Sequence, residues 1–96
     1  IRLAEAYLFQ EKWADAIAAA SEALNLARES QQFAVEGEAW RVLGRIAEKT
    51  VAPVPVGSSQ HEAASCLAES KRLFLAGGQD DKAADVTQHL SNLAAE

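Results

Sequence analysis

Residues 38–47 limit what this chain can fold into more than any other segment of the sequence. Within them, Trp40, Leu43, Gly44 and Ala47 are spaced i, i+3, i+4 and i+7, so they lie on one face of a helix. A glycine inside a helix costs about 1 kcal/mol relative to alanine, and close approach of a second helix is the usual reason for it. The pattern therefore predicts a helix with Trp40 in the core and a second helix packed against Gly44.

The composition favours a small domain of packed helices. Of the 96 residues, 49% are hydrophobic and 6% aromatic, alanine is abundant, and glycine and proline are confined to a few places. A chain of this length forms one domain with a core of modest size. No apolar run approaches the roughly 20 residues that a membrane span requires, and no signal-peptide pattern is present. We therefore expect a cytoplasmic protein with no membrane partner.

Charge and cysteine content exclude further classes. The net charge of −5 argues against nucleic acid as a partner, because phosphate binding requires a basic surface. The single cysteine, Cys66, excludes an internal disulfide framework and fits a reducing compartment. The chain begins at Ile1 and contains no methionine, which predicts that it is a segment of a longer protein.

Apolar stripes separated by polar breaks predict five helices. The first is the end of a helix at residues 1–9, and the others span residues 14–28, 33–49, 59–76 and 80–96. Ser59 and Glu62 form a capping-box pattern at the start of the fourth helix, and Gly77–Gly78 form a C-cap at its end.

Residues 50–59 interrupt this helical pattern. Pro53 and Pro55 prevent a helix from continuing through the segment, and valines alternate with the prolines. An extended or polyproline-like loop is therefore expected, with no assigned role.

Three segments share the pattern of a small residue next to a large one. They are Leu3-Ala4…Tyr7, Leu43-Gly44…Ala47 and Val86-Thr87…Leu90, spaced by about 40 residues. This pattern, with Trp40, resembles the first helix of a tetratricopeptide repeat (TPR). The resemblance implies an all-α fold in which helical hairpins stack into a short right-handed solenoid of about five helices. In its longer period, the chain is similar to the extended repeats of large bacterial signalling proteins, such as ATPase-coupled nucleotide cyclases and multidomain transcriptional activators.

The resemblance covers a single domain, residues 1–96. Residues 1–30 form repeat 1 with a truncated first helix, residues 33–76 form repeat 2 with residues 50–59 inserted, and residues 79–96 form a terminal helix or partial third repeat. The repeat core that the resemblance implies consists of Leu3, Tyr7, Trp13, Ala16, Ala20, Ala23, Trp40, Leu43, Gly44, Ala47, Ala63, Leu67, Val86 and Leu90.

In TPR arrays the first helices of successive repeats line a concave groove that receives an extended peptide or a helix. By motif match, the groove residues here are Glu5, Leu8, Phe9, Glu38, Arg41, Arg45, Glu48, Lys49, Asp81, Gln88, Ser91 and Asn92. The preferred function is a non-catalytic interaction module that binds a protein or peptide. The alternative is self-association, for example as a homodimer, or a spacer that couples a sensor to an output domain in a larger bacterial signalling or transcription-regulating protein.

Arg41, Arg45 and Lys49 form a basic stripe at i, i+4 and i+8 on an otherwise acidic chain. In one interpretation the stripe pairs with carboxylates of a partner segment, since arginine offers bidentate geometry. In the other it is a solvated face whose arginines pair locally with Glu38 and Glu48.

Leu8 and Phe9 also have two interpretations. Both lie off the Leu3/Tyr7 stripe, so one of them could be an exposed apolar anchor for a partner. Alternatively, chain that precedes residue 1 covers them.

The sequence predicts neither an enzyme nor a cofactor or metal site. Gly77–Gly78 lacks the lysine and the preceding strand of a phosphate-binding loop. His61, His89 and Cys66 do not occur at ligand spacing. Cys66 lies on the inner face of its helix, where it packs as a small apolar residue.

Overall fold

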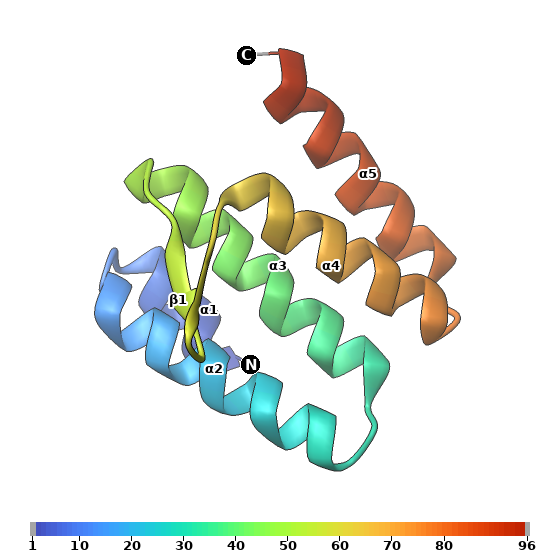
Figure 1. Cartoon of the computed structure of the whole chain (residues 1–96), viewed down its shortest axis with the longest axis horizontal. Coiled ribbons are helices and arrows are strands. Elements are labelled where there is room, and N and C mark those ends of the chain that lie inside the picture. Colours follow the sequence, from blue (N-terminus) through green and yellow to red (C-terminus); the bar gives the residue numbers. More distant parts are fainter. Residues whose placement is uncertain (1, 96) are drawn as a thin grey trace.

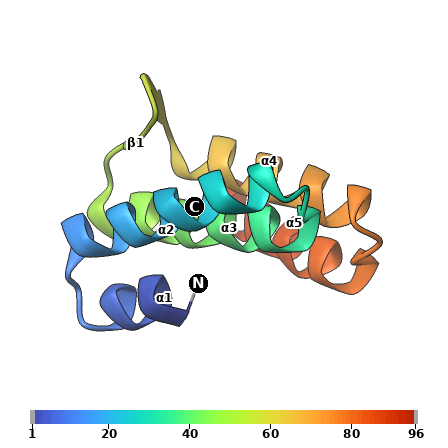
Figure 2. The same cartoon turned by 90° about the horizontal axis from the view of Figure 1, so that it is seen from below.

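Five helices pack in sequence order in the computed structural model, which describes residues 2–95. They are α1 (Arg2–Phe9), α2 (Trp13–Glu29), α3 (Phe33–Thr50), α4 (Ala63–Ala76) and α5 (Asp80–Ala95). Helices α2 to α5 lie side by side, and a short hairpin crosses in front of α3 and reaches α2 (Figure 1). Helix α1 lies on the side of α2 and α3 opposite to the hairpin (Figure 2). The prediction of five sequential helices is confirmed.

Three of the turns between helices share one backbone hydrogen-bond pattern. In each turn, an N–H donates to the carbonyl oxygen five residues earlier: Lys12 to Tyr7 (2.9 Å), Gln32 to Ala27 (2.9 Å) and Gln79 to Phe74 (2.7 Å). The residue before each donor has a positive φ: Glu11 (60°), Gln31 (56°) and Gly78 (76°). This left-handed residue ends one helix and turns the chain directly into the next. The C-cap predicted at Gly77–Gly78 is therefore confirmed, whereas the equivalent turns at Glu11 and Gln31 use residues that gave no such signal.

The connection between α3 and α4 begins in the same way but continues into the hairpin. The Ala52 N–H donates to the Ala47 carbonyl oxygen at 3.2 Å, and Val51 has a φ of 51°. The chain then forms β1 (Val54–Val56) and β2 (Ser59–His61). The segment predicted to be an extended loop therefore contains two short strands, and the domain is mostly helical.

The two strands are antiparallel and pair Val54 with His61, Pro55 with Gln60, and Val56 with Ser59. Because side chains alternate between the two faces of a strand, the first and third pairs share one face and the second pair has the other. Val54 is 1% exposed, so the face of the first and third pairs is the one turned to the helices. The alternating valines that predicted an extended loop thus form a half-buried ribbon.

The capping box predicted at Ser59 is also wrong. Ser59 belongs to β2, and α4 begins four residues later, at Ala63. Glu62 precedes the helix in an extended conformation, and no side chain caps the helix N-terminus. Strand pairing across the hairpin overrides the local capping signal.

Helix α3 approaches α4 closely at two glycines. A Cβ at Gly44 would lie 3.0 Å from two side-chain atoms of Leu67, and one at Gly37 would lie 2.9 Å from the Phe74 ring. The buried Ser70 hydroxyl also donates to the Gly37 carbonyl oxygen at 2.7 Å. The close approach predicted at Gly44 is confirmed, with α4 as the second helix.

Most of the predicted core residues are buried. Those fully buried are Ala16, Ala20, Trp40, Leu43, Gly44, Ala47, Leu67 and Val86. Those half-buried against the core are Tyr7, Trp13, Ala23, Ala63 and Leu90. The prediction for Leu3 is wrong, because its side chain is 59% exposed. Helix α1 instead buries Ala4 and Leu8, which are one turn apart and turned to the neighbouring helices.

Candidate functional site

A pocket of about 470 Å³ lies between α1 and the C-terminal end of α3, and we call it the α1–α3 pocket. It is lined by Glu5, Leu8, Phe9, Glu11, Trp13, Arg45 and Lys49. Five of these residues were assigned to the groove from the repeat pattern, and α1 and α3 bring them together although they are about 40 residues apart in sequence. Glu11, from the turn between α1 and α2, and Trp13, at the start of α2, complete the pocket.

Charges of both signs line this pocket. Arg45 and Lys49 come from α3, and Glu5 and Glu11 come from α1 and its following turn. Within residues 2–95, none of the ion pairs joins these four side chains. Lys49 also lies in the last turn of α3, where a cation interacts favourably with the helix dipole. The pocket therefore presents cationic donors and anionic acceptors that are free to bind a partner.

Leu8 and Phe9 line the apolar part of the pocket and differ in exposure. Leu8 is 7% exposed and belongs to the core, so it is not an exposed anchor. Phe9 is 93% exposed. Trp13 is half-buried and packs against the core beside the pocket. An exposed aromatic ring next to a half-buried one forms a surface suited to an apolar partner side chain.

Two predicted groove residues contact α5. The Glu38 carboxylate lies 3.1 Å from Lys82 Nζ, and the Glu48 carboxylate lies 2.6 Å from His89 Nε2. Local pairing of Arg41 and Arg45 with these glutamates is therefore wrong, because both carboxylates contact α5 instead. The basic stripe has no ion-pair partner among the residues that the structure describes.

The other groove residues lie outside the α1–α3 pocket. Arg41 is half-buried on α3. The Gln88 amide donates to Asn92 at 3.2 Å on an exposed part of α5, and Asp81 and Ser91 are also exposed on that helix. The structure thus divides the predicted groove into a pocket at α1 and a separate polar surface on α5.

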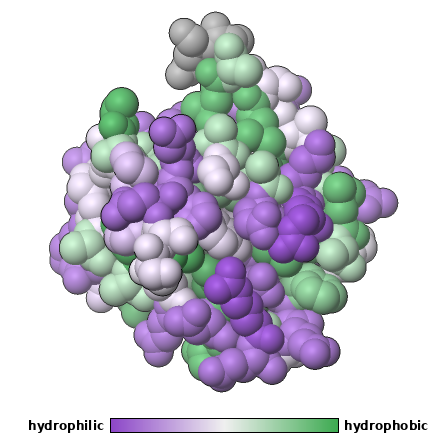
Figure 3. All heavy atoms as spheres, viewed as in Figure 1, coloured by the Kyte–Doolittle hydropathy of each residue, from purple (hydrophilic) through white to green (hydrophobic). Residues whose placement is uncertain are grey.

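A second pocket, of about 490 Å³, lies on the other side of the molecule, and we call it the hairpin pocket. Helices α2 and α4 and the hairpin surround it, and Trp40 lies at its base. Hydrophilic residues cover much of the middle and lower part of this face (Figure 3). Sequence analysis missed this pocket. Its only local signals are polar residues at helical spacing on α2 (Ser21, Asn25, Arg28) and on α4 (Ser65, Glu69).

Cys66 is a buried titratable residue outside these two pockets. Burial raises the pKa of the Cys66 thiol to about 11, so this thiol is protonated near pH 7 and is not a nucleophile there. Within the described residues, no group of three or more His, Cys, Asp or Glu side chains is placed to hold a metal ion. No helix in residues 2–95 is both long enough and apolar enough to cross a membrane.

Comparison with protein-family models, with curated proteins and with solved structures found no significant match.

Proposed function

We propose that this chain is a non-catalytic protein-interaction module with TPR-like packing. The observation that carries the proposal is the α1–α3 pocket, which brings together Glu5, Phe9, Arg45 and Lys49. The repeated turn geometry and the close approach of α4 to Gly44 are further support, because stacked helical hairpins need both. We also propose that these helical hairpins stack into a short solenoid.

The charges of the pocket define the class of partner. Arg45 and Lys49 supply charge-assisted hydrogen bonds to a carboxylate, and the exposed Phe9 ring contacts an apolar side chain beside it. Glu5 and Glu11 repel a segment that is acidic along its whole length. The proposed ligand is therefore an extended or helical segment that carries one acidic side chain next to an apolar one.

Selection of short random peptides displayed on phage tests this proposal. We expect the immobilised chain to select peptides with an Asp or Glu beside an apolar residue. The Arg45→Glu/Lys49→Glu variant should bind the synthesised peptides at least about tenfold more weakly, because two attractive charges become repulsive. The matched control is Arg2→Glu/Lys71→Glu, which changes the net charge equally outside the pocket and should keep wild-type affinity. Equal binding by the wild-type chain and the Arg45/Lys49 variant, or a selection without such a consensus, would overturn the proposal.

A second candidate function, self-association, is favoured by an apolar surface at the ends of α3 and α5. Val51 is 89% exposed there, and it lines a hollow of about 360 Å³ together with Pro53, Ala63 and Leu93. Hydrophobic residues also gather near the C-terminal end of α5 (Figure 3). Exposed apolar surface of this kind promotes association.

Sedimentation across a concentration series tests self-association. A dimer that forms with rising concentration is the expected result, and Val51→Asn should return it to monomer. Asparagine tolerates the left-handed backbone at this position better than valine does, so the variant is expected to remain folded. A monomer at every concentration would exclude this second function.

A further inference from the structure

The hairpin pocket is the second region of the molecule in which groups distant in sequence converge. Arg28 comes from α2, Trp40 from α3, His61 from the hairpin, and Ser65 and Glu69 from α4. Its volume of about 490 Å³ lies within the ~300–1,000 Å³ range of small-molecule sites.

The hairpin builds one wall of this pocket. Val56, Ser59 and His61 lie on the same strand face as the buried Val54, so they are directed to the helices. Gly57, with a φ of 63°, makes the tight turn that places this face over the pocket. The insertion between α3 and α4 supplies this wall, and the helices alone would leave that side of the pocket open.

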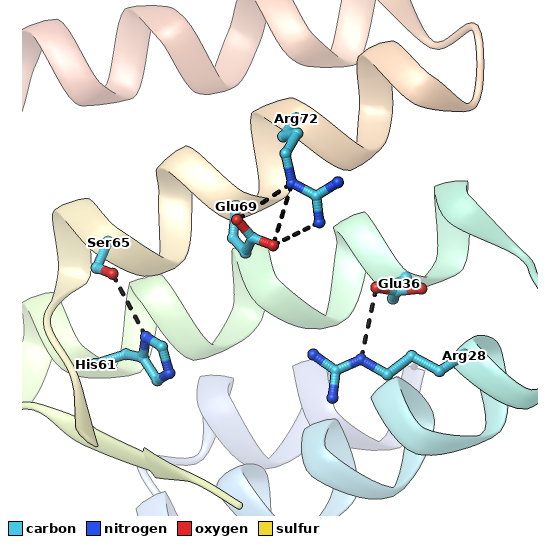
Figure 4. Close-up of polar contacts among 6 residues, drawn as sticks. All are labelled: Arg28, Glu36, His61, Ser65, Glu69 and Arg72. Atoms are coloured by element: carbon cyan, nitrogen blue, oxygen red, sulfur yellow. Dashed lines mark hydrogen bonds and ion pairs between the residues drawn. The ribbon is translucent and has the colours of Figure 1, made fainter. Parts of the chain in front are cut away.

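Arg28 supplies the positive charge of the pocket. Its Nε lies 3.6 Å from the Glu36 carboxylate, and its guanidinium lies 5.9 Å from the centre of the Trp40 ring. Figure 4 shows the two terminal nitrogens of Arg28 directed away from Glu36, to the side where His61 lies. The contact with Glu36 therefore orients Arg28 while its terminal N–H groups stay available to a ligand.

Glu69 supplies the negative charge. Arg72 Nη2 donates to Glu69 Oε1 at 2.6 Å, and Arg72 Nε lies 3.2 and 3.3 Å from the two carboxylate oxygens (Figure 4). The hydrogen bond from Arg72 lowers the pKa of Glu69, burial opposes this more weakly, and Arg28 and His61 lower it further. Glu69 is therefore ionised at neutral pH.

Arg28 and Glu69 do not neutralise each other directly. Both line the pocket, yet no ion pair joins them within the described part of the chain. A ligand with only one sign of charge is repelled by one of the two groups, whereas a ligand with both signs is attracted by each.

The Trp40 ring forms part of the pocket lining. The Trp40 indole Nε1 is buried, and no hydrogen-bond acceptor reaches it among the residues that the structure describes. The Trp40 ring also meets His61 edge to face, with ring centres 5.0 Å apart. Because Nε1 is inaccessible to solvent, the Trp40 ring contributes to the pocket through its contact with His61 and not through this donor.

We propose that the hairpin pocket binds a small zwitterion of amino-acid size, with its carboxylate at Arg28 and its ammonium group at Glu69. Hydroxyl and amide groups of Ser65 and Asn25 complete the polar contacts. This site is separate from the α1–α3 pocket and does not depend on the function proposed for it.

Tryptophan fluorescence can read this pocket selectively. The chain has two tryptophans, Trp13 in the α1–α3 pocket and Trp40 in the hairpin pocket. In the Trp13→Phe variant, Trp40 is therefore the single reporter. Titration with a panel of the standard free amino acids, each to about 10 mM, should give a saturable change with at least one of them.

Variants of the pocket, and ligands in which one charged group is blocked, show which charges of the protein and of the ligand are needed for binding. Glu69→Gln and Arg28→Gln should each weaken binding at least about tenfold, with circular dichroism confirming that both variants fold. Arg72→Gln is the matched control, because it breaks the same ion pair from outside the pocket and should change affinity by less than about threefold. The N-acetyl and the amide derivatives of the bound amino acid should both bind more weakly than the free form.

The possible results separate clearly. Binding that is unchanged by Glu69→Gln, or equal binding of the N-acetyl derivative, would identify an anion site and overturn the proposal. The absence of any saturable signal across the panel would also overturn it. Arg45→Glu/Lys49→Glu should leave the fluorescence titration unchanged, so this result is independent of the test of the α1–α3 pocket.

Discussion

Replacement of Trp40 by alanine is expected to lower the free energy of unfolding by about 3–5 kcal/mol. The ring is 2% exposed and lies in the main core cluster. It also contacts His61 of the hairpin edge to face and the Arg28 guanidinium. Truncation to alanine therefore leaves a cavity where α3, the hairpin and α2 meet. Urea denaturation followed by far-ultraviolet circular dichroism measures the loss without relying on tryptophan fluorescence.

Trp40→Phe is the matched control for this prediction. Phenylalanine keeps an aromatic ring in the core and removes the unpaired indole N–H. An unsatisfied buried donor costs about 1–3 kcal/mol, which offsets the packing lost with the smaller ring. We therefore expect Trp40→Phe to change stability by less than about 1 kcal/mol. A loss below about 1 kcal/mol for Trp40→Ala itself would contradict the placement of this ring in the core and the repeat register built on it.

Phe74→Ala is expected to cost a similar amount, about 3–5 kcal/mol, and to loosen α5 selectively. Phe74 is fully buried and packs against Gly37 of α3 on one side. On the other side it belongs to a cluster with Ala83 and Val86 of α5. Loss of the ring removes an apolar contact that joins α5 to α3 and α4. Hydrogen exchange should show faster exchange of α5 amides relative to those of α3.

Leu75→Ala is the control for the second prediction. Leu75 is the next residue on α4 but is 50% exposed, so its truncation should cost less than about 1 kcal/mol. If Phe74→Ala accelerates exchange equally in α3 and α5, then α5 is not held mainly by this ring.

The helices and their inner faces follow from sequence periodicity. The stripe of Trp40, Leu43, Gly44 and Ala47 predicted a buried face and a close partner, and both are present in α3. Such predictions succeed because side chains three and four residues apart share a helix face wherever the helix forms. Leu3 is an exception to this rule. Helix α1 is short and has few neighbours, so only part of its apolar stripe is buried. The positions of those neighbours decide which part is buried.

The hairpin shows how tertiary contacts override local signals. Ser59 and Glu62 carry a pattern typical of a helix start, and the prolines before them are typical of an irregular loop. Pairing of β1 with β2 and burial of Val54 instead favour a ribbon packed on the helices. These contacts join the hairpin residues to a surface formed by the helices, and that surface exists only after the helices have packed.

The sequence by itself determined the number of helices and, apart from α1, most of the face that each buries. These features depend on short-range spacing along the chain. Only the tertiary structure decided that Arg28, His61 and Glu69 face one cavity. Each is an ordinary polar residue within its own segment. Their convergence depends on how the hairpin docks between α2 and α4, which no local pattern encodes.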